Sequence, residues 1–274
     1  LVYKLLGNKK WTATKLILLI IVISLVFIFL VGFFIFNRHM LKTNFENDIL
    51  PFARKNQNTI FKINKITFFS SCNAKNKTAS NSNFTIEDLY QYTDIALFIT
   101  STSEEKTLEN TLKKVSINNI KFTSSPTLGE PKLYYKNINN FAKSEISEEN
   151  LINENLDFNI TSEDEVNLDK PTLYNNLANP IVLSYINHNI KTDYTITDTS
   201  TPMTYDGSLL KRCNILLNNI AFSFSFDVYV TNNLSQEFKC TIYIDIPLDL
   251  DNQSIYNGNI TLKKDTNFNF YRYR

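Results

Sequence analysis

Residues 221–230 read AFSFSFDVYV, and the alternation within this stretch decides the fold class. Every second side chain from Phe222 to Val230 is phenylalanine or valine, whereas serines and Asp227 fall between them. Side chains of a strand point alternately to opposite faces, so a period of two places one apolar face against a core and one polar face in solvent. The stretch is typical of a half-buried β-strand.

The same alternation returns after a polar loop at Asn232–Asn233. Apolar side chains from Phe238 to Ile246, with Cys240 and Ile242 among them, alternate with polar ones. Two consecutive strands that each have one apolar and one polar face predict an antiparallel hairpin.

Turn signals and further alternating segments extend the β pattern over most of the chain. The pair Asn257–Gly258 predicts a two-residue type I′ turn, and a phase slip at Asn118–Asn119 predicts a bulge or a tight turn. The further strand candidates are 60–69, 92–100, 113–122, 180–187, 192–197, 209–217 and 267–273, and the few helical signals are at 86–91, 104–114 and 147–155. Many short strands with turns between them indicate a mainly β fold, which we expect to be an antiparallel β-sandwich-like region.

The N-terminal part has a different character. Leu16 to Phe36 is a run without any charged residue, and only Ser24 and Gly32 interrupt its leucine, isoleucine, valine and phenylalanine side chains. A helix of roughly 20 residues is about as long as the hydrocarbon core of a bilayer is thick. We therefore expect residues 16–36 to be a single transmembrane helix in contact with membrane lipid. The rival interpretation is a cleaved signal peptide, whose apolar stretch is usually shorter and ends at a small-residue site.

The charges that flank this run predict its orientation. Residues 1–15 carry four lysines and no acidic residue, and basic flanks stay on the cytoplasmic side. We expect residues 1–15 to be a cytoplasmic tail, 37–57 a juxtamembrane stalk, and 58–274 an extracytoplasmic β domain anchored in the cell membrane. The part outside carries slightly more acidic than basic residues, so it lacks the positive patch that nucleic acid requires.

One segment of the β region is strongly acidic. Residues 143–170 hold nine aspartates and glutamates against Lys143 and Lys170, and they have little apolar periodicity. This composition favours a solvated insertion between portions of the sheet, and a cation-binding or partner-docking loop is the alternative.

The three cysteines allow several chemistries. Cys72, Cys213 and Cys240 make an odd number, which leaves at least one cysteine unpaired outside the cytoplasm. Cys213 and Cys240 both fall in phase with neighbouring apolar residues, which favours buried free thiols. A disulfide between Cys213 and Cys240 is the second interpretation, and catalytic use is the third.

The catalytic alternative has a family model. His188, then Cys213 or Cys240, then Arg272 follow one another in the chain order of a membrane-anchored β protein. This arrangement resembles the sortases, transpeptidases of Gram-positive surfaces, and the resemblance implies a cysteine nucleophile assisted by His188 and Arg272. The family's nucleophile ends a T-L-x-T-C strand, whereas this chain reads Glu237-Phe238-Lys239-Cys240.

No other constellation of residues points to catalysis or to a cofactor. Only two histidines are present, so a histidine-rich metal site is excluded. Asp245, Asp249, Asp251 and Asn252 could offer oxygen ligands to calcium, but Ser254 and Ile260 occupy positions where the EF-hand loop requires glycine and glutamate. We expect no cofactor, no metal and a non-catalytic role: binding a cell-wall or surface component, or serving as a structural partner in a membrane complex.

Overall fold

The computed structural model describes residues 13–54, 60–80, 83–163, 170–197, 202–247 and 253–272. By contacts the chain divides into two units, residues 1–54 and residues 55–274. Each unit is described by itself.

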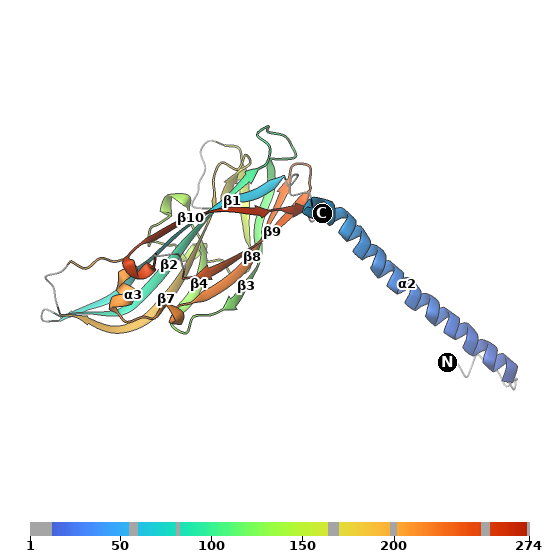
Figure 1. Cartoon of the computed structure of the whole chain (residues 1–274), viewed down its shortest axis with the longest axis horizontal. Coiled ribbons are helices and arrows are strands. Elements are labelled where there is room, and N and C mark those ends of the chain that lie inside the picture. The colour runs from blue at the N-terminus through green and yellow to red at the C-terminus, as the bar shows by residue number, and fades with distance from the viewer. Residues whose placement is uncertain are drawn as a thin grey trace. The chain divides into compact units, whose positions relative to one another are not determined.

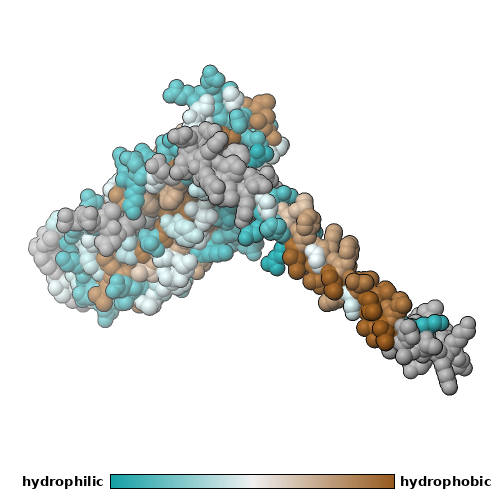
Figure 2. Space-filling model, turned by 45° about the vertical axis from the view of Figure 1, so that its right-hand side comes forward, coloured by the Kyte–Doolittle hydropathy of each residue, from teal (hydrophilic) through white to brown (hydrophobic). Residues whose placement is uncertain are grey.

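The described part of the first unit is one long helix, α2, which spans Ala13–Arg54. Within it, Ile17–Asn44 is long and apolar enough to cross a membrane. Its leucine, isoleucine, valine and phenylalanine side chains are exposed at consecutive positions and so all around the helix, and Phe29 is 72% exposed. Figure 2 shows one side of this apolar surface. A helix that is apolar all round cannot be solvated at low cost in water. The expected apolar helix over 16–36 is thus confirmed, and the helix continues past it as far as Arg54, through most of the expected stalk.

The second unit is a sandwich of two sheets (Figure 1). The five-stranded sheet has the order β10-β1-β2-β7-β4, and all its neighbouring strands are antiparallel. Its strands are β1 Phe61–Ser80, β2 Asn83–Ser101, β4 Glu130–Tyr135, β7 Ile181–Ile196 and β10 Ile260–Asn269.

The six-stranded sheet has the order β11-β9-β8-β3-β5-β6, and it is antiparallel except for the β5–β6 pair. Its strands are β3 Leu112–Ser124, β5 Leu156–Thr161, β6 Thr172–Tyr174, β8 Phe222–Asn232, β9 Glu237–Ile246 and β11 Tyr271–Arg272. The predicted hairpin of 221–230 and 238–246 is confirmed as β8 and β9, with Phe224 opposite Ile244.

The main core lies between the two sheets. Tyr185 of β7 stacks on Phe222 of β8 with ring centroids 4.6 Å apart, and Phe224 and Phe226 continue the same row. Aromatic pairs of this kind add to the free energy gained from the buried area. The antiparallel β-sandwich predicted from the alternating strands is confirmed.

A second apolar cluster lies further along the strands of the five-stranded sheet. It joins Cys72 of β1 and Leu89 of β2 to a short helix, α3 Ser208–Arg212, and to the 3₁₀ turns η3 Leu217–Asn219 and η4 Ile255–Asn257. The expected strand over 209–217 is therefore wrong, because this segment folds back as helical turns that cover the apolar end of the long strands.

Four other local expectations are also wrong. Residues 86–91 belong to β2 instead of a helix, and 104–114 is a turn that leads into β3. In 147–155 only η2, Glu148–Asn150, is helical. Asn257–Gly258 ends η4, with Gly258 at φ 115° and ψ −140°, so it is not a type I′ hairpin turn. The bulge expected at Asn118–Asn119 is confirmed by a register shift there and by φ 55° at Asn119.

The acidic segment 143–170 is not simply a solvated insertion. Its middle forms β5, which pairs with β3 and buries Leu156 and Phe158 in the main core. The acidic side chains alternate with these apolar ones, so Asp157 faces solvent. Residues 164–169 of the segment lie outside the described part.

Candidate functional site

The structure separates the residues of the sortase-like interpretation. Cys240 lies on the core face of β9 in the six-stranded sheet, whereas His188 lies on β7 in the five-stranded sheet. Cys213 caps the end of α3 inside the second apolar cluster. Arg272 of β11 is paired with Phe238. The sequence order thus does not produce a common site for these side chains.

All three cysteines are buried free thiols. Burial raises the pKa of the Cys240 thiol to about 12 and also raises the pKa values of Cys72 and Cys213. A thiol acts as a nucleophile through its thiolate, which needs an exposed and electropositive setting. These thiols serve as small apolar side chains, which agrees with the buried free thiols that the sequence favours.

His188 is engaged on the outer face of the five-stranded sheet. Its Nε2 lies 3.0 Å from the Tyr134 hydroxyl, which also donates to the carboxylate of Glu148. Burial, together with the charge of Lys132, lowers the pKa of His188. The imidazole is therefore neutral near pH 7 and fixes the loop that carries Glu148, since Tyr134 connects the two.

The same outer face holds a buried ion pair that the sequence does not reveal. Lys136 Nζ donates to both carboxylate oxygens of Asp94, at 2.9 and 2.8 Å, and the two side chains are 3% and 0% exposed. Two further groups donate to the Asp94 carboxylate: the Ser184 hydroxyl at 2.6 Å and the Ala142 N–H at 2.8 Å. The pair thereby fastens the loop after β4 onto the sheet.

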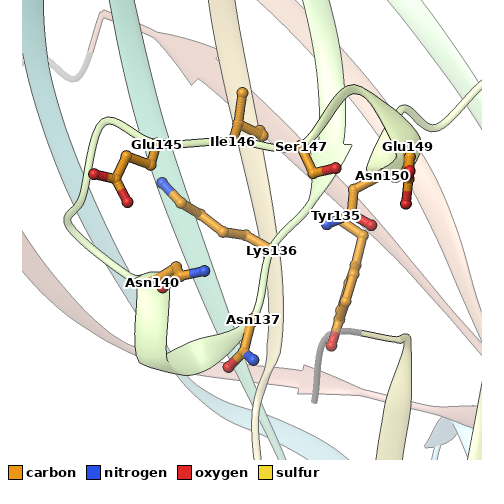
Figure 3. Close-up of a pocket in the computed structure, with 9 residues that line it drawn as sticks. All are labelled: Tyr135, Lys136, Asn137, Asn140, Glu145, Ile146, Ser147, Glu149 and Asn150. Atoms are coloured by element: carbon orange, nitrogen blue, oxygen red, sulfur yellow. The ribbon is translucent and has the colours of Figure 1, made fainter. Parts of the chain in front are cut away.

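That loop forms a pocket with a volume of about 380 Å³ (Figure 3). Amide, hydroxyl and carboxylate groups dominate its lining, and the stem of Lys136 extends along it toward the segment of Glu145 and Ile146. The lining residues are Tyr135, Lys136, Asn137, Asn140, Glu145, Ile146, Ser147, Glu149 and Asn150. Pockets for drug-like ligands are mostly apolar, so this one suits a small, strongly polar ligand.

The uncompensated charge in the lining of the pocket is negative. Glu145 and Glu149 line it, whereas the only cationic group in the lining, Lys136, has its ammonium group bonded to Asp94. The pocket is thus unsuited to an anion, and its amide and hydroxyl groups offer both donors and acceptors.

Metal chemistry has little support in the described part of the chain. Among those residues, no group of three or more histidine, cysteine, aspartate and glutamate side chains is placed to hold a metal ion. Of the oxygen-rich cluster, Asp245 lies on β9, and Asp249, Asp251 and Asn252 lie outside the described residues.

Comparison of the chain with protein-family models, with curated proteins and with solved structures finds no match. A function must therefore be inferred from the apolar helix, the sandwich and the pocket.

Proposed function

We propose that this protein is anchored in the cell membrane by residues 16–36, with residues 1–15 in the cytoplasm and the β-sandwich outside. The observation that carries the proposal is the uncharged helical segment whose N-terminal flank holds lysines and no acidic residue. Positive charge retained inside sets the orientation of a single span. The sandwich then faces the cell wall or the surroundings.

In this position the sandwich acts as a non-catalytic binding module, and the pocket formed by the loop after β4 is its ligand site. A polar pocket with Asn137, Asn140 and Asn150 beside Ser147 suits a ligand rich in hydroxyl or amide groups. The carboxylates of Glu145 and Glu149 disfavour phosphorylated ligands. A neutral saccharide of the cell surface fits this chemistry.

Protease treatment of intact cells tests the topology. A tag on the C-terminus is expected to be removed by protease, while a tag on the N-terminus stays protected until the cells are lysed. Replacement of Lys9, Lys10 and Lys15 with glutamate is expected to reduce the exported fraction, because it removes the charge bias. A C-terminal tag that stays protected, or a product released into the medium, would overturn the proposal.

Ligand-detected NMR tests the pocket. N-acetylglucosamine and its short oligomers are the probes, and saturation transfer from the detergent-solubilised protein is the readout. Asn140→Ala and Asn150→Ala are expected to abolish the transfer, whereas Asn153→Ala, at an exposed neighbouring position outside the lining, should leave it unchanged. If no saccharide gives transfer and the protein is recovered from membranes in a stable complex, the role as a structural partner is favoured instead.

A further inference from the structure

Lys136 reaches across a whole strand to meet Asp94. Its own backbone N–H donates to Val182 on β7, directly after β4 has ended. Asp94 lies on β2, on the opposite side of β7, where its cross-strand partner is Ser184. Because β4, β7 and β2 are successive neighbours in the sheet, the Lys136 side chain spans the middle strand over its outer face.

The amine and the carboxyl group are enclosed together. The Lys136 Nζ lies 2.9 and 2.8 Å from the two Asp94 oxygens and also donates to the Lys143 carbonyl. Ser184 and the Ala142 N–H complete the contacts of the carboxyl group. The Tyr92 ring packs against the Lys136 ammonium group, with its centroid 5.4 Å from Nζ. This packing excludes water from both the Lys136 amine and the Asp94 carboxyl group.

We propose that Lys136 and Asp94 form a covalent amide bond between Nζ and Cγ. The nitrogen lone pair of the neutral amine attacks Cγ of the neutral carboxylic acid, an N–C bond forms, and one C–O bond breaks. The departing oxygen leaves as water with one proton from the amine and one from the acid. The overall change is an ammonium–carboxylate pair converted to an amide plus water, so no oxidant or other co-reactant is needed.

The environment lowers the cost of reaching the neutral forms that this reaction requires, by transfer of a proton from the ammonium to the carboxylate. Burial raises the pKa of Asp94 and lowers that of Lys136, and in each case it outweighs the attraction between the two charges. Proximity in a fixed orientation supplies the remaining advantage, because the amine nitrogen is already held 2.9 and 2.8 Å from the two carboxyl oxygens and little further entropy is lost on attack. The Ser184 hydroxyl donates to Oδ1 and can therefore stabilise the negative charge that develops on this oxygen during the attack.

A second ion pair in the same domain provides the comparison. Lys239 Nζ lies 2.8 Å from Asp227 on the outer face of the other sheet, but its side chain is 32% exposed. There, the hydrogen bond that Lys239 donates to the Asp227 carboxylate raises the pKa of the lysine, which keeps the amine protonated. The distance between lysine and aspartate is the same in the two pairs, but only the Lys136 side chain is fully buried. We therefore expect no amide between Lys239 and Asp227.

An amide between Lys136 and Asp94 would join the edge strand β4 to the central strand β2 through a bond that does not depend on hydrogen bonds of β7. In a domain exported on a membrane anchor, this bond would hold the pocket loop in place against pulling forces and proteases.

Intact mass spectrometry of the denatured full-length protein tests the proposal. The wild type and Lys239→Met are expected to be lighter than their sequences require by one molecule of water, whereas Lys136→Met and Asp94→Ala have their full masses. Peptide mapping of the wild type should give a branched peptide that links the segments containing Asp94 and Lys136, which keeps the test valid if a variant fails to fold. Folded wild-type protein of full mass, with both residues in unbranched peptides, would overturn the proposal.

Discussion

Gln91 of β2 lies directly opposite Asn187 of β7, and each carries a buried side-chain oxygen without a hydrogen-bond partner among the described residues. Gln91 Nε2 donates to the hydroxyls of Ser70 and Thr93, at 3.2 and 2.7 Å. These side chains form a polar layer on the inner face of the five-stranded sheet, between the main core and the apolar cluster around Cys72. This polar layer thus divides the interior into two apolar parts, and the strands of the five-stranded sheet run through both.

Replacement of Tyr185, in the main core beside this layer, tests how buried polar groups without a partner affect stability. Its buried hydroxyl has no partner in the described part of the chain, while its ring stacks on Phe222. Tyr185→Phe keeps the stack and removes only the unpaired hydroxyl, so the free energy of unfolding should stay within about 0.5 kcal/mol of the wild type or rise slightly. Gln91→Leu is the matched opposite, because it removes two hydrogen bonds, and it should lose about 1–2 kcal/mol. Urea unfolding measures both, and an equal loss in the two variants would contradict this account.

Gly129 makes a closer test of the same region. A Cβ at this position would lie 2.2 Å from Asn187 Oδ1, and its φ of 89° is one that other residues rarely adopt. Gly129→Ala should therefore lower the free energy of unfolding by about 2–4 kcal/mol, through backbone strain and through displacement of a buried side chain. Gly258→Ala is the control, since it has a similar φ of 115° but its nearest contact is at 3.3 Å. Its loss should be clearly smaller, and a reversed order in thermal unfolding would contradict the explanation.

The sequence predicts the elements whose alternation is uninterrupted, and it fails where bulges shift the phase. β8 and β9 alternate without a break and are predicted correctly. In β2, register shifts lie between Ile86 and Asp88 and between Leu89 and Gln91, and they leave apolar residues three positions apart. That spacing imitates a helix, so residues 86–91 are assigned wrongly. Only pairing with β1 and β7 determines their conformation.

The candidate site was beyond sequence reasoning for a different reason. Asp94 and Lys136 are 42 positions apart, and neither belongs to a recognisable motif. Their contact depends on the order of β2, β7 and β4 in the sheet, and the pocket depends on where the loop after β4 crosses that sheet. Long-range strand order is not encoded in local periodicity. The apolar span of α2 is encoded locally, as an uninterrupted run of apolar residues, and the sequence therefore predicts it.

Asp227 gives the domain a defined response to acid. Burial opposes ionisation of this carboxyl group, but hydrogen bonds from Lys239, Thr241 and Asn119 outweigh it and hold its pKa below the usual range. A group with a lowered pKa in the folded state stabilises the fold above its unfolded pKa, and this contribution is lost as the pH falls through the folded value. Asp227→Asn should cost about 1–3 kcal/mol at pH 7 and progressively less below about pH 4.

Urea unfolding at a series of pH values measures that difference. Asp157→Asn, at an exposed position on β5, is the control and should change stability little at any pH. A cost for Asp227→Asn that stays constant from pH 7 to pH 3 would show that the ionised carboxylate contributes nothing to the fold.

Thiol labelling decides between a binding module and a cysteine enzyme. Cys72, Cys240 and Cys213 are 0%, 4% and 7% exposed, and burial raises the pKa of each. In the folded, reduced protein we expect labelling to be slower than in urea by at least about 100-fold, because each thiol must wait for an opening of the structure. Cys213, at the end of the short helix α3, should react first of the three, and Cys213→Ser should remove this first phase. A thiol that reacts at once at neutral pH, and whose rate falls in His188→Ala, would instead favour the sortase-like chemistry, since only an activated thiolate near His188 would respond to both changes.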